Sequence, residues 1–283
     1  MDIVFIDETF DINQTKNYNI SIQAGLNGYS FSVIDPVRNK YILLKHIAFK
    51  GEMTTRLLEE KIEELQKSDE FLARDYKNVL FSYQSPKYTL IPGPLFNKDN
   101  LRTYFEFNHH LDDLDEIHFN RFKSTDAYNI FIIPAEISGI IHRSFGNVNY
   151  FNQATPLAEA GMVKHGGKSS HRVAVANIYG NFMDIAVIQG EKLLLCNTFP
   201  WKSDEDLVYF ILYVYEQLKL DGEDTPLFIS GEMKKNSGIY DILRSYIRKT
   251  KFEKRNDQFV YSYTLNDVDA HWFVNLFNLQ MCV

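Results

Sequence analysis

One order of predicted elements occurs twice in this chain, and the repeat limits the possible folds more than any single motif. In the first half, alternating apolar and polar residues predict a two-stranded hairpin, which a third strand, an amphipathic helix and a short buried strand follow. These elements fall at residues 18–24, 29–34, 41–49, 57–65 and 79–83. Gly25 and Asn27-Gly28 supply the turn of the hairpin, because glycine and asparagine tolerate the backbone angles of tight turns.

The second half of the chain repeats this order. Its predicted strands and helix fall at residues 172–177, 182–188, 193–199, 205–218 and 227–230. When the halves are superposed, Gln23 corresponds to Asn177, and Phe81-Ser82 corresponds to Ile229-Ser230, although few residues are identical. The repeat predicts two similar α/β domains packed about a pseudo-twofold axis with a cleft between them. The alternative is a single mixed sheet with unrelated halves.

The length of the chain agrees with two domains, since 283 residues exceed the ~100–200 residues of one typical domain. The segment from Gly161 to Ser170 is rich in glycine and lysine, as interdomain linkers often are. We therefore predict a first domain at residues 1–165 and a second at residues 166–283. The apolar residues 270–281 predict a helix at the end of the second domain, which docks on its own domain or on a partner.

Two units of three strands, a helix and a fourth strand resemble the duplicated ribonuclease-H-like fold of the actin, sugar-kinase and heat-shock-chaperone ATPases. Within that superfamily, the chain is similar to bacterial assembly proteins, namely the cell-division actin homologue and the type IV pilus assembly protein with an actin-like fold. It also resembles a bacterial family of unknown function. The resemblance covers roughly residues 17–250 and implies an actin-like ATPase fold.

The nucleotide motifs depart from those of the ATPases. In that superfamily, the first hairpin of each domain carries an aspartate and glycines, because the turn approaches the phosphates and the carboxylate holds Mg²⁺. Here Gln23 and Asn177 stand at the two carboxylate positions, and Glu232 adds bulk and charge after the single glycine of the adenosine segment. The resemblance implies a degenerate nucleotide cleft with no assigned catalytic or metal residue. Its candidate residues are Gln23, Gly25, Gly28, Asn177, Gly180, Asp184, Ser230 and Gly231.

These departures favour a pseudo-ATPase that works as a binding or scaffold module without a cofactor. An amide oxygen accepts hydrogen bonds but brings no negative charge to a magnesium ion. The alternative is an active ATPase or small-molecule kinase that binds ATP with Mg²⁺ and recruits Asp184, or Asp35 after the first hairpin. We expect Asp184 to be a solvated strand position between Met183 and Ile185.

Two other segments contain reactive residue types without a recognisable site. The stretch from His109 to His118 holds possible metal ligands, but its spacing matches no known site and its acidity predicts a solvated loop. The segment from Gly161 to Ser170 lacks the spacing of a phosphate-binding loop and predicts a flexible hinge. Cys196 lies in a predicted strand, where a buried apolar role is expected.

Charge and chain composition bear on partners and location. The chain has 30 basic and 37 acidic residues, a formal charge of −7, and no long basic run, which disfavours nucleic acid as a partner. No apolar run approaches the ~20 residues of a membrane span, and the acidic start differs from a secretory signal. Two cysteines that are far apart in the sequence indicate a reducing compartment, so we expect a cytoplasmic protein. We also expect it to bind a protein partner or to self-associate.

Overall fold

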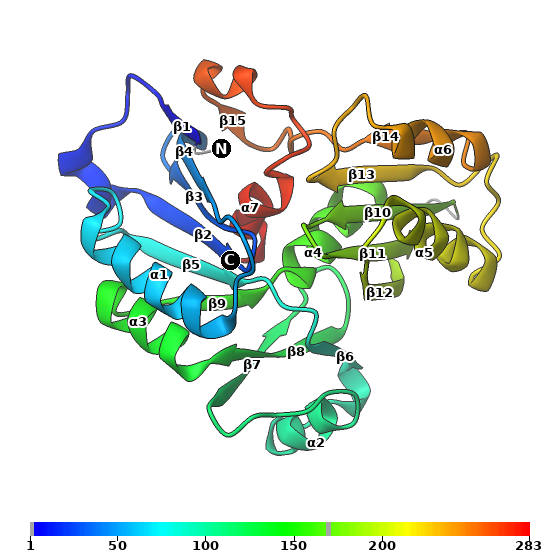
Figure 1. Ribbon diagram of the computed structural model, residues 1–283, viewed down its shortest axis with the longest axis horizontal. Coiled ribbons are helices and arrows are strands. Elements are labelled where there is room, and N and C mark those ends of the chain that lie inside the picture. The colour runs from blue at the N-terminus through cyan, green and yellow to red at the C-terminus, as the bar shows by residue number, and fades with distance from the viewer. Residues whose placement is uncertain (1–2, 168–170) are drawn as a thin grey trace.

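The first repeat unit forms a mixed sheet at one side of the molecule (Figure 1). The structure is a computed structural model, which describes residues 3–167 and 171–283. The strand order of this sheet is β1-β4-β3-β2-β5-β9, and the short strand β15 also pairs with β4. The strands are β1 (Ile3–Ile6), β2 (Asn19–Gly25), β3 (Gly28–Asp35), β4 (Lys40–Ala48), β5 (Asn78–Tyr83), β9 (Asn149–Asn152) and β15 (Val260–Tyr261).

The second unit forms a sheet of the same topology. Its order, β12-β11-β10-β13-β14, matches β4-β3-β2-β5-β9 strand for strand. The strands are β10 (Arg172–Ile178), β11 (Phe182–Gln189), β12 (Lys192–Pro200), β13 (Leu227–Gly231) and β14 (Thr250–Phe252). The register also agrees, because Gln23 pairs with Ser82 across β2 and β5 as Asn177 pairs with Ser230 across β10 and β13. The prediction of two ribonuclease-H-like units is confirmed, and the single mixed sheet is wrong.

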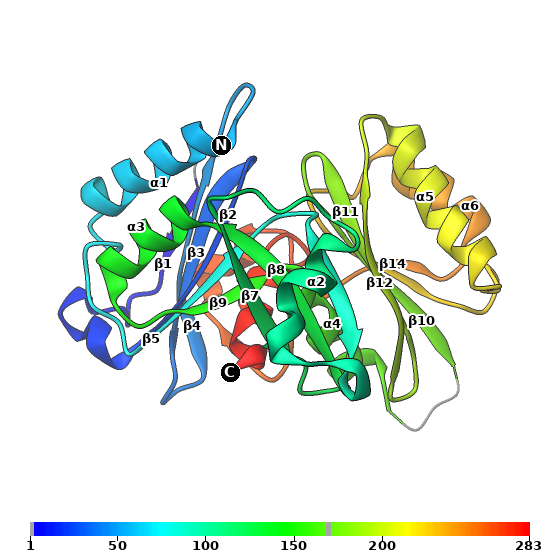
Figure 2. The same ribbon diagram turned by 90° about the horizontal axis from the view of Figure 1, so that it is seen from below.

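Two helices cover the outer face of each sheet (Figure 2). These helices are α1 (Thr55–Ser68) and α3 (Ala135–Phe145) in the first unit, and α5 (Asp204–Gln217) and α6 (Gly238–Tyr246) in the second. Thr54 begins α1 by accepting a hydrogen bond from the Leu57 backbone, and Ser203 begins α5 with a capping box that includes Asp206. Helices α1 and α5 then each bury one apolar side, which includes Ile62 in α1 and Ile211 in α5.

Helix α4 (Ala154–His165) lies between the two sheets and occupies the first half of the predicted linker. Its residues Ala154–Met162 are buried, because α4 contacts the second sheet on one side and the C-terminal segment on the other. Gly161 of this helix packs closely against Ile188 of β11, since a Cβ at position 161 would lie 2.7 Å from Ile188 Cδ1. The prediction of a flexible linker is thus wrong for residues 161–165, whereas residues 168–170 of the predicted linker lie outside the described residues. The boundary at residue 165 stays a prediction.

A third, smaller sheet extends the first domain toward the second. Its order is β6-β8-β7, with β6 (Tyr88–Pro92), β7 (Asp115–Arg121) and β8 (Ala127–Pro134), and α2 (Leu101–Glu106) packs against it. Strand β7 contains His118, so the predicted acidic loop ends earlier than expected. Phe105, Ile130 and Ile132 form the small core under α2.

The C-terminal segment crosses back to the first sheet, where α7 (Val274–Asn278) lies between the two large sheets (Figure 1). Its Phe273, Leu276 and Phe277 are buried against Tyr41 and Leu80 of the first sheet. Docking on the same chain agrees with one of the two expected outcomes, but the segment contacts β13 of the second domain and also covers the inner face of the first sheet, which was not expected. The physical reason is that the inner face of the first sheet is apolar and needs a cover.

Within residues 3–167 and 171–283, no helix is both long enough and apolar enough to cross a membrane.

Candidate functional site

A cleft of about 910 Å³ lies between the two domains, at the tips of their hairpins. Five of the eight candidate residues line it, namely Gln23, Gly28, Asn177, Gly180 and Gly231. Gly25, Asp184 and Ser230 do not line the cleft, although all three belong to the strands that form its floor. The structure therefore brings together, in one cleft, most of the residues that the alignment of the two repeats identified as candidates.

The two amide residues occupy equivalent positions in the two floors. Gln23 lies next to Ser82, and Asn177 lies next to Ser230, whose Oγ donates a hydrogen bond of 2.7 Å to Asn177 Oδ1. The Asn177 side chain is thereby held by its own domain. Each amide faces the cleft without a negative charge, so neither floor offers the carboxylate that Mg²⁺ prefers.

The two hairpin tips touch each other at Asn27 and Gly180. A Cβ at Gly180 would lie 2.4 to 2.7 Å from the terminal atoms of the Asn27 side chain. Asn27 therefore fills the space directly in front of the second turn, and only glycine fits at position 180 without displacing it. A similar close approach explains Gly25, since a Cβ there would meet the Gln84 side chain at 2.2 Å. Asn27 escaped sequence reasoning as a site residue because its Asn-Gly pair reads as a turn signal alone.

The segment after β13 forms another wall of the cleft. Gly231 has a φ of +87°, and a Cβ on it would lie 2.1 Å from the Ile178 carbonyl oxygen, so glycine is required. Its N–H donates to the His271 carbonyl at 2.9 Å, and the Glu232 N–H donates to the Ile178 carbonyl at 2.9 Å. These bonds hold the Glu232 side chain at the cleft wall, where partial loss of water raises the pKa of Glu232.

The C-terminal segment supplies the opposite wall and was missed by the motif analysis. Asp267, Asp269, Trp272 and Phe273 line the cleft there, and Asp269 forms an ion pair with Lys235 at 2.6 Å. The predicted helix contained Trp272 and Phe273, but its return to the first domain depends on contacts that are distant in sequence. Among the described residues, the carboxylates that line the cleft are Glu232, Asp267 and Asp269, and none belongs to a hairpin.

Asp184 is buried below the cleft, so its expected solvated position is wrong. The side chain has no exposed surface and accepts a hydrogen bond from Thr198 Oγ1 of β12. Burial raises the pKa of Asp184 to about 7, and hydrogen bonds with Thr198 and Gln153 oppose the rise. The cause of the burial is the packing of α4 and the third sheet over this face of β11. Asp184 is therefore out of reach of a ligand in the cleft.

The other reactive segments separate in the structure. His109 Nε2 lies 2.8 Å from the Tyr88 carbonyl oxygen, whereas His110 is exposed beside Asp112 at 3.3 Å. Over the ranges that the structure describes, no group of three or more His, Cys, Asp or Glu side chains is placed to hold a metal ion. Cys196 is half-buried, and its Sγ lies 3.7 Å from the Tyr88 hydroxyl.

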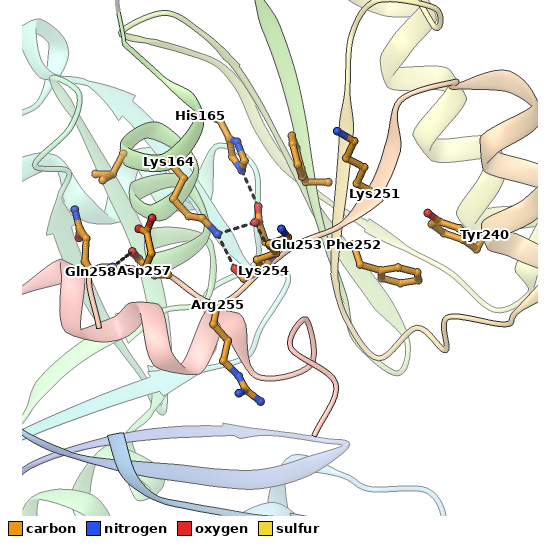
Figure 3. Close-up of a pocket in the computed structure, with 13 residues that line it drawn as sticks. Lys164, His165, Tyr240, Lys251, Phe252, Glu253, Lys254, Arg255, Asp257 and Gln258 are labelled. Atoms are coloured by element: carbon orange, nitrogen blue, oxygen red, sulfur yellow. Dashed lines mark hydrogen bonds and ion pairs between the residues drawn. The ribbon is translucent and has the colours of Figure 1, made fainter. Parts of the chain in front are cut away.

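A second hollow, of about 680 Å³, lies at the end of α4 (Figure 3). Its Lys164 Nζ and His165 Nε2 lie 2.6 and 2.7 Å from the two carboxylate oxygens of Glu253. Burial alone would raise the pKa of Glu253, but His165 and Lys164 lower it to about 2. Lys164, which the sequence predicted to lie in a flexible hinge, is thus neutralised by Glu253 and joins α4 to the segment after β14.

Comparisons with known proteins agree with this architecture. A family model described as "Protein of unknown function (DUF3822)" matches residues 7–250. A Bacteroides thetaiotaomicron protein with an actin-like ATPase fold and unknown function is 23% identical, with a TM-score of 0.80 over 97% of this chain and 100% of that chain. A chain of the PilM-PilN type IV pilus biogenesis complex is 10% identical, with a TM-score of 0.60 over 94% and 98%.

A search of curated proteins found no match. The family model covers well over half of the chain, and the two structural neighbours share its fold over nearly their whole length. The chain therefore belongs to the DUF3822 family of proteins of unknown function, and it has the actin-like ATPase fold.

Proposed function

We propose that this protein is a pseudo-ATPase, which uses the actin-like fold as a cytoplasmic protein-binding module and does not hydrolyse nucleotide. The observation that carries the proposal is the contact between Asn27 and Gly180. In an ATPase of this fold, the two hairpins approach the phosphates, so a side chain wedged between their tips competes with a triphosphate for the same space.

The charges of the cleft support the same conclusion. Gln23 and Asn177 are neutral, and the three lining carboxylates belong to the walls and not to the hairpins. The basic residues that line the cleft are Lys234, which is exposed, and His46. The three carboxylates outnumber them, so the cleft is acidic and repels a triphosphate. The alternative enzyme needs Asp184 to meet a ligand, and this residue does not line the cleft.

A protein partner is proposed by analogy with the PilM-PilN complex, in which a neighbour of this fold assembles with another protein. The two cysteines are free, which fits a reducing compartment. Nothing in this function requires ATP or Mg²⁺, so the proposed module has no cofactor.

Calorimetric titration with MgATP, followed by an assay of phosphate release, tests the nucleotide half of the proposal. We expect no binding tighter than about 100 μM and no phosphate release. The matched variants are Asp184→Asn and Asp7→Asn, because both replace a buried aspartate but only Asp184 lies beneath the cleft. Phosphate release that disappears in Asp184→Asn and persists in Asp7→Asn would establish the enzyme alternative instead.

The partner half is tested separately by cross-linking in cells and affinity purification in buffers with and without MgATP. We expect the same partner in both buffers, since the proposed binding is independent of nucleotide. A partner that is recovered only with MgATP would contradict the proposal even if hydrolysis is absent.

A further inference from the structure

Most of the lining of the interdomain cleft is uncharged. Among the described residues, those that line it from positions 3–84 and 177–180 include no Asp, Glu, Lys or Arg. The charged lining residues fall at positions 231–234 and 266–269, where Asp269 is paired with Lys235 and the charge of Lys234 offsets one of the two other carboxylates. A charged ligand would lose water against the uncharged lining without meeting an opposite charge there. The cleft therefore favours an uncharged ligand.

The uncharged lining is rich in carboxamide side chains that have no partner of their own. Gln23, Asn27 and Gln84 are half-buried at the cleft, and their side chains form no hydrogen bond with another residue that the structure describes. Each carboxamide offers two N–H donors and an acceptor oxygen. These three side chains can therefore both donate to a ligand and accept from it.

A fourth carboxamide of the cleft, Asn275, is buried with one of its atoms unpaired. Asn275 is 4% exposed, and its Nδ2 donates to the Gln153 carbonyl and to the Tyr179 hydroxyl, which fixes the orientation of the amide. Its Oδ1 is buried without a hydrogen-bond partner in the described part of the chain, and so is Nε1 of Trp272, which also lines the cleft. Since burying a polar atom without a partner is unfavourable, a ligand that pairs with these atoms is stabilised in the cleft.

Aromatic side chains form another part of the lining. Phe5, Trp272 and Phe273 belong to one apolar cluster and line the cleft together, and Phe5 and Trp272 are only half-buried. Small-molecule sites typically combine such aromatic surface with a few polar groups, in volumes of about 300–1,000 Å³. The cleft, at about 910 Å³, lies within this range.

We propose that the interdomain cleft binds an uncharged saccharide, whose hydroxyl groups bond to the free carboxamides and whose ring packs against the aromatic side chains. The carboxamides come from separate segments, namely the first hairpin, the residue after β5 and α7. A ligand that pairs with all of them needs hydrogen-bonding groups around its whole edge.

The chemistry of a saccharide ring fits this requirement. Its hydroxyl groups surround the ring, and each of them donates and accepts as a carboxamide does. The C–H groups on its faces are apolar and suit the rings of Phe5 and Trp272. A nucleobase or a peptide group has its donors and acceptors along one or two edges, which would leave part of the lining unpaired. This ligand goes beyond the proposed protein-binding function and does not depend on it.

Saturation-transfer NMR and calorimetry of the full chain test the proposal with glucose, galactose, N-acetylglucosamine and maltose. We expect at least one of them to bind with a dissociation constant of about 10 μM to 1 mM. Glucuronic acid and glucose 6-phosphate should bind at least about tenfold more weakly than that sugar, because the uncharged lining offers no cation to pair with. No binding of the four neutral sugars up to about 10 mM, or tighter binding of adenosine or N-acetyl-alanine amide, overturns the proposal.

Two single variants test the carboxamides. Gln23→Ala and Gln84→Ala should each weaken binding of the sugar about tenfold and leave the melting temperature unchanged, because neither side chain has a partner within the described chain. Gln217→Ala is the control, since Gln217 is exposed at the end of α5 and does not line the cleft, and it should bind as the wild type does. Unchanged affinity in both cleft variants overturns the proposed contacts.

Tryptophan fluorescence locates the bound sugar. The chain has two tryptophans, of which Trp272 lines the cleft and Trp201 does not. We expect the sugar to change the fluorescence of the wild type and of Trp201→Phe but not that of Trp272→Phe. The opposite result places the sugar outside the cleft and overturns the proposal. Neither the MgATP titration nor the partner purification uses a saccharide, so the proposed function keeps its own test.

Discussion

Two buried aspartates of the protein lie in opposite electrostatic surroundings. Asp7 is nearly inaccessible to solvent, and although its burial alone would raise the pKa, an ion pair of 2.7 Å with Lys40 and hydrogen bonds from Ser262 and Thr9 hold the pKa of Asp7 below its usual range. Asp184 has hydrogen bonds with Thr198 and Gln153 but no ion pair with any residue that the structure describes, so burial raises its pKa to about 7. Their contributions to stability therefore depend on pH in opposite directions.

Asp184 should destabilise the fold as the pH rises. Its pKa is 3.8 in a model compound and about 7 in the folded chain, so the folded state holds the extra proton between these values. The contribution of this proton to the free energy of unfolding is complete below pH 3.8 and declines as the pH rises to 7. Because each unit of difference in pKa corresponds to about 1.4 kcal/mol, the decline is at most roughly 4 kcal/mol. Denaturant unfolding of Asp184→Asn should therefore show a smaller fall in stability from pH 5 to pH 8 than the wild type, and a greater stability at pH 8.

Asp7→Asn is the matched control for this measurement. Because the pKa of Asp7 is lowered, its contribution is present at neutral pH and is lost only as the pH falls below its model value of 3.8. Asp7→Asn should therefore lose stability at pH 7, where Asp184→Asn does not. If both variants lose stability equally at pH 8, the raised pKa of Asp184 is contradicted.

Sequence reasoning located Asp184 in a strand but could not find its burial. Alternation along β11 predicts one buried face, which contains Met183 and Ile185 and contacts α5 and α6. The other face, which contains Asp184, would be solvated in an isolated sheet. It is covered by α4, and that contact joins residues that are far apart in the chain.

At the scale of elements, the four strands and the helix of each repeated unit were predicted well because their patterns are local, whereas the outer helix α6 was not predicted. The hairpin, the capped helix and the final strand of each unit need only neighbouring residues, and their alignment agrees with the observed register. The end of helix α4 was mistaken for a linker because Gly161, and Gly166 and Gly167 directly after the helix, were read as breakers of regular structure. The length of α4 is instead determined by packing between two sheets, which no local pattern records.

Two helical glycines should respond oppositely to substitution. At Gly139 of α3, a Cβ would meet only the end of the Arg143 side chain at 3.2 Å, so Gly139→Ala should stabilise the protein by about 1 kcal/mol through helix propensity. At Gly161 of α4, a Cβ would press on Ile188, so Gly161→Leu should destabilise it by about 1–3 kcal/mol through overpacking. Urea unfolding measures both, and an unchanged stability of Gly161→Leu would show that α4 is not tightly packed there.

In the whole molecule, the C-terminal segment holds the two domains together. Phe273, Leu276 and Phe277 belong to the core beneath the first sheet, and the Tyr41 hydroxyl donates a hydrogen bond to the Phe277 carbonyl. The same segment contacts the second domain, since the His271 carbonyl accepts from Gly231 and His271 Nε2 lies 2.7 Å from the Met233 carbonyl. Residues 270–283 thus contribute to the core of the first domain and to a wall of the cleft between the two domains.

Hydrogen exchange of a chain truncated after Asp269 tests this coupling. The truncation removes Phe273, Leu276 and Phe277 from the first domain, whereas the core beneath α5 and α6 keeps all of its residues. We therefore expect protection to fall first in β4 and β5, by more than the about 2–5 kcal/mol of one large apolar side chain, while β10 and β11 stay protected.

A matched single substitution separates the loss of core from the loss of interdomain contacts. Asn275 Nδ2 donates to the Gln153 carbonyl at 2.9 Å and to the Tyr179 hydroxyl at 2.8 Å, and so ties α7 to the start of α4 and to the second hairpin. Asn275→Ala should cost about 1–3 kcal/mol, because it leaves buried polar partners unpaired, and should lower protection around Tyr179 while the first sheet keeps its core. If the truncation instead exposes β10 and β11 before β4 and β5, the segment stabilises the second domain, and its packing on the first sheet is not what holds the molecule together.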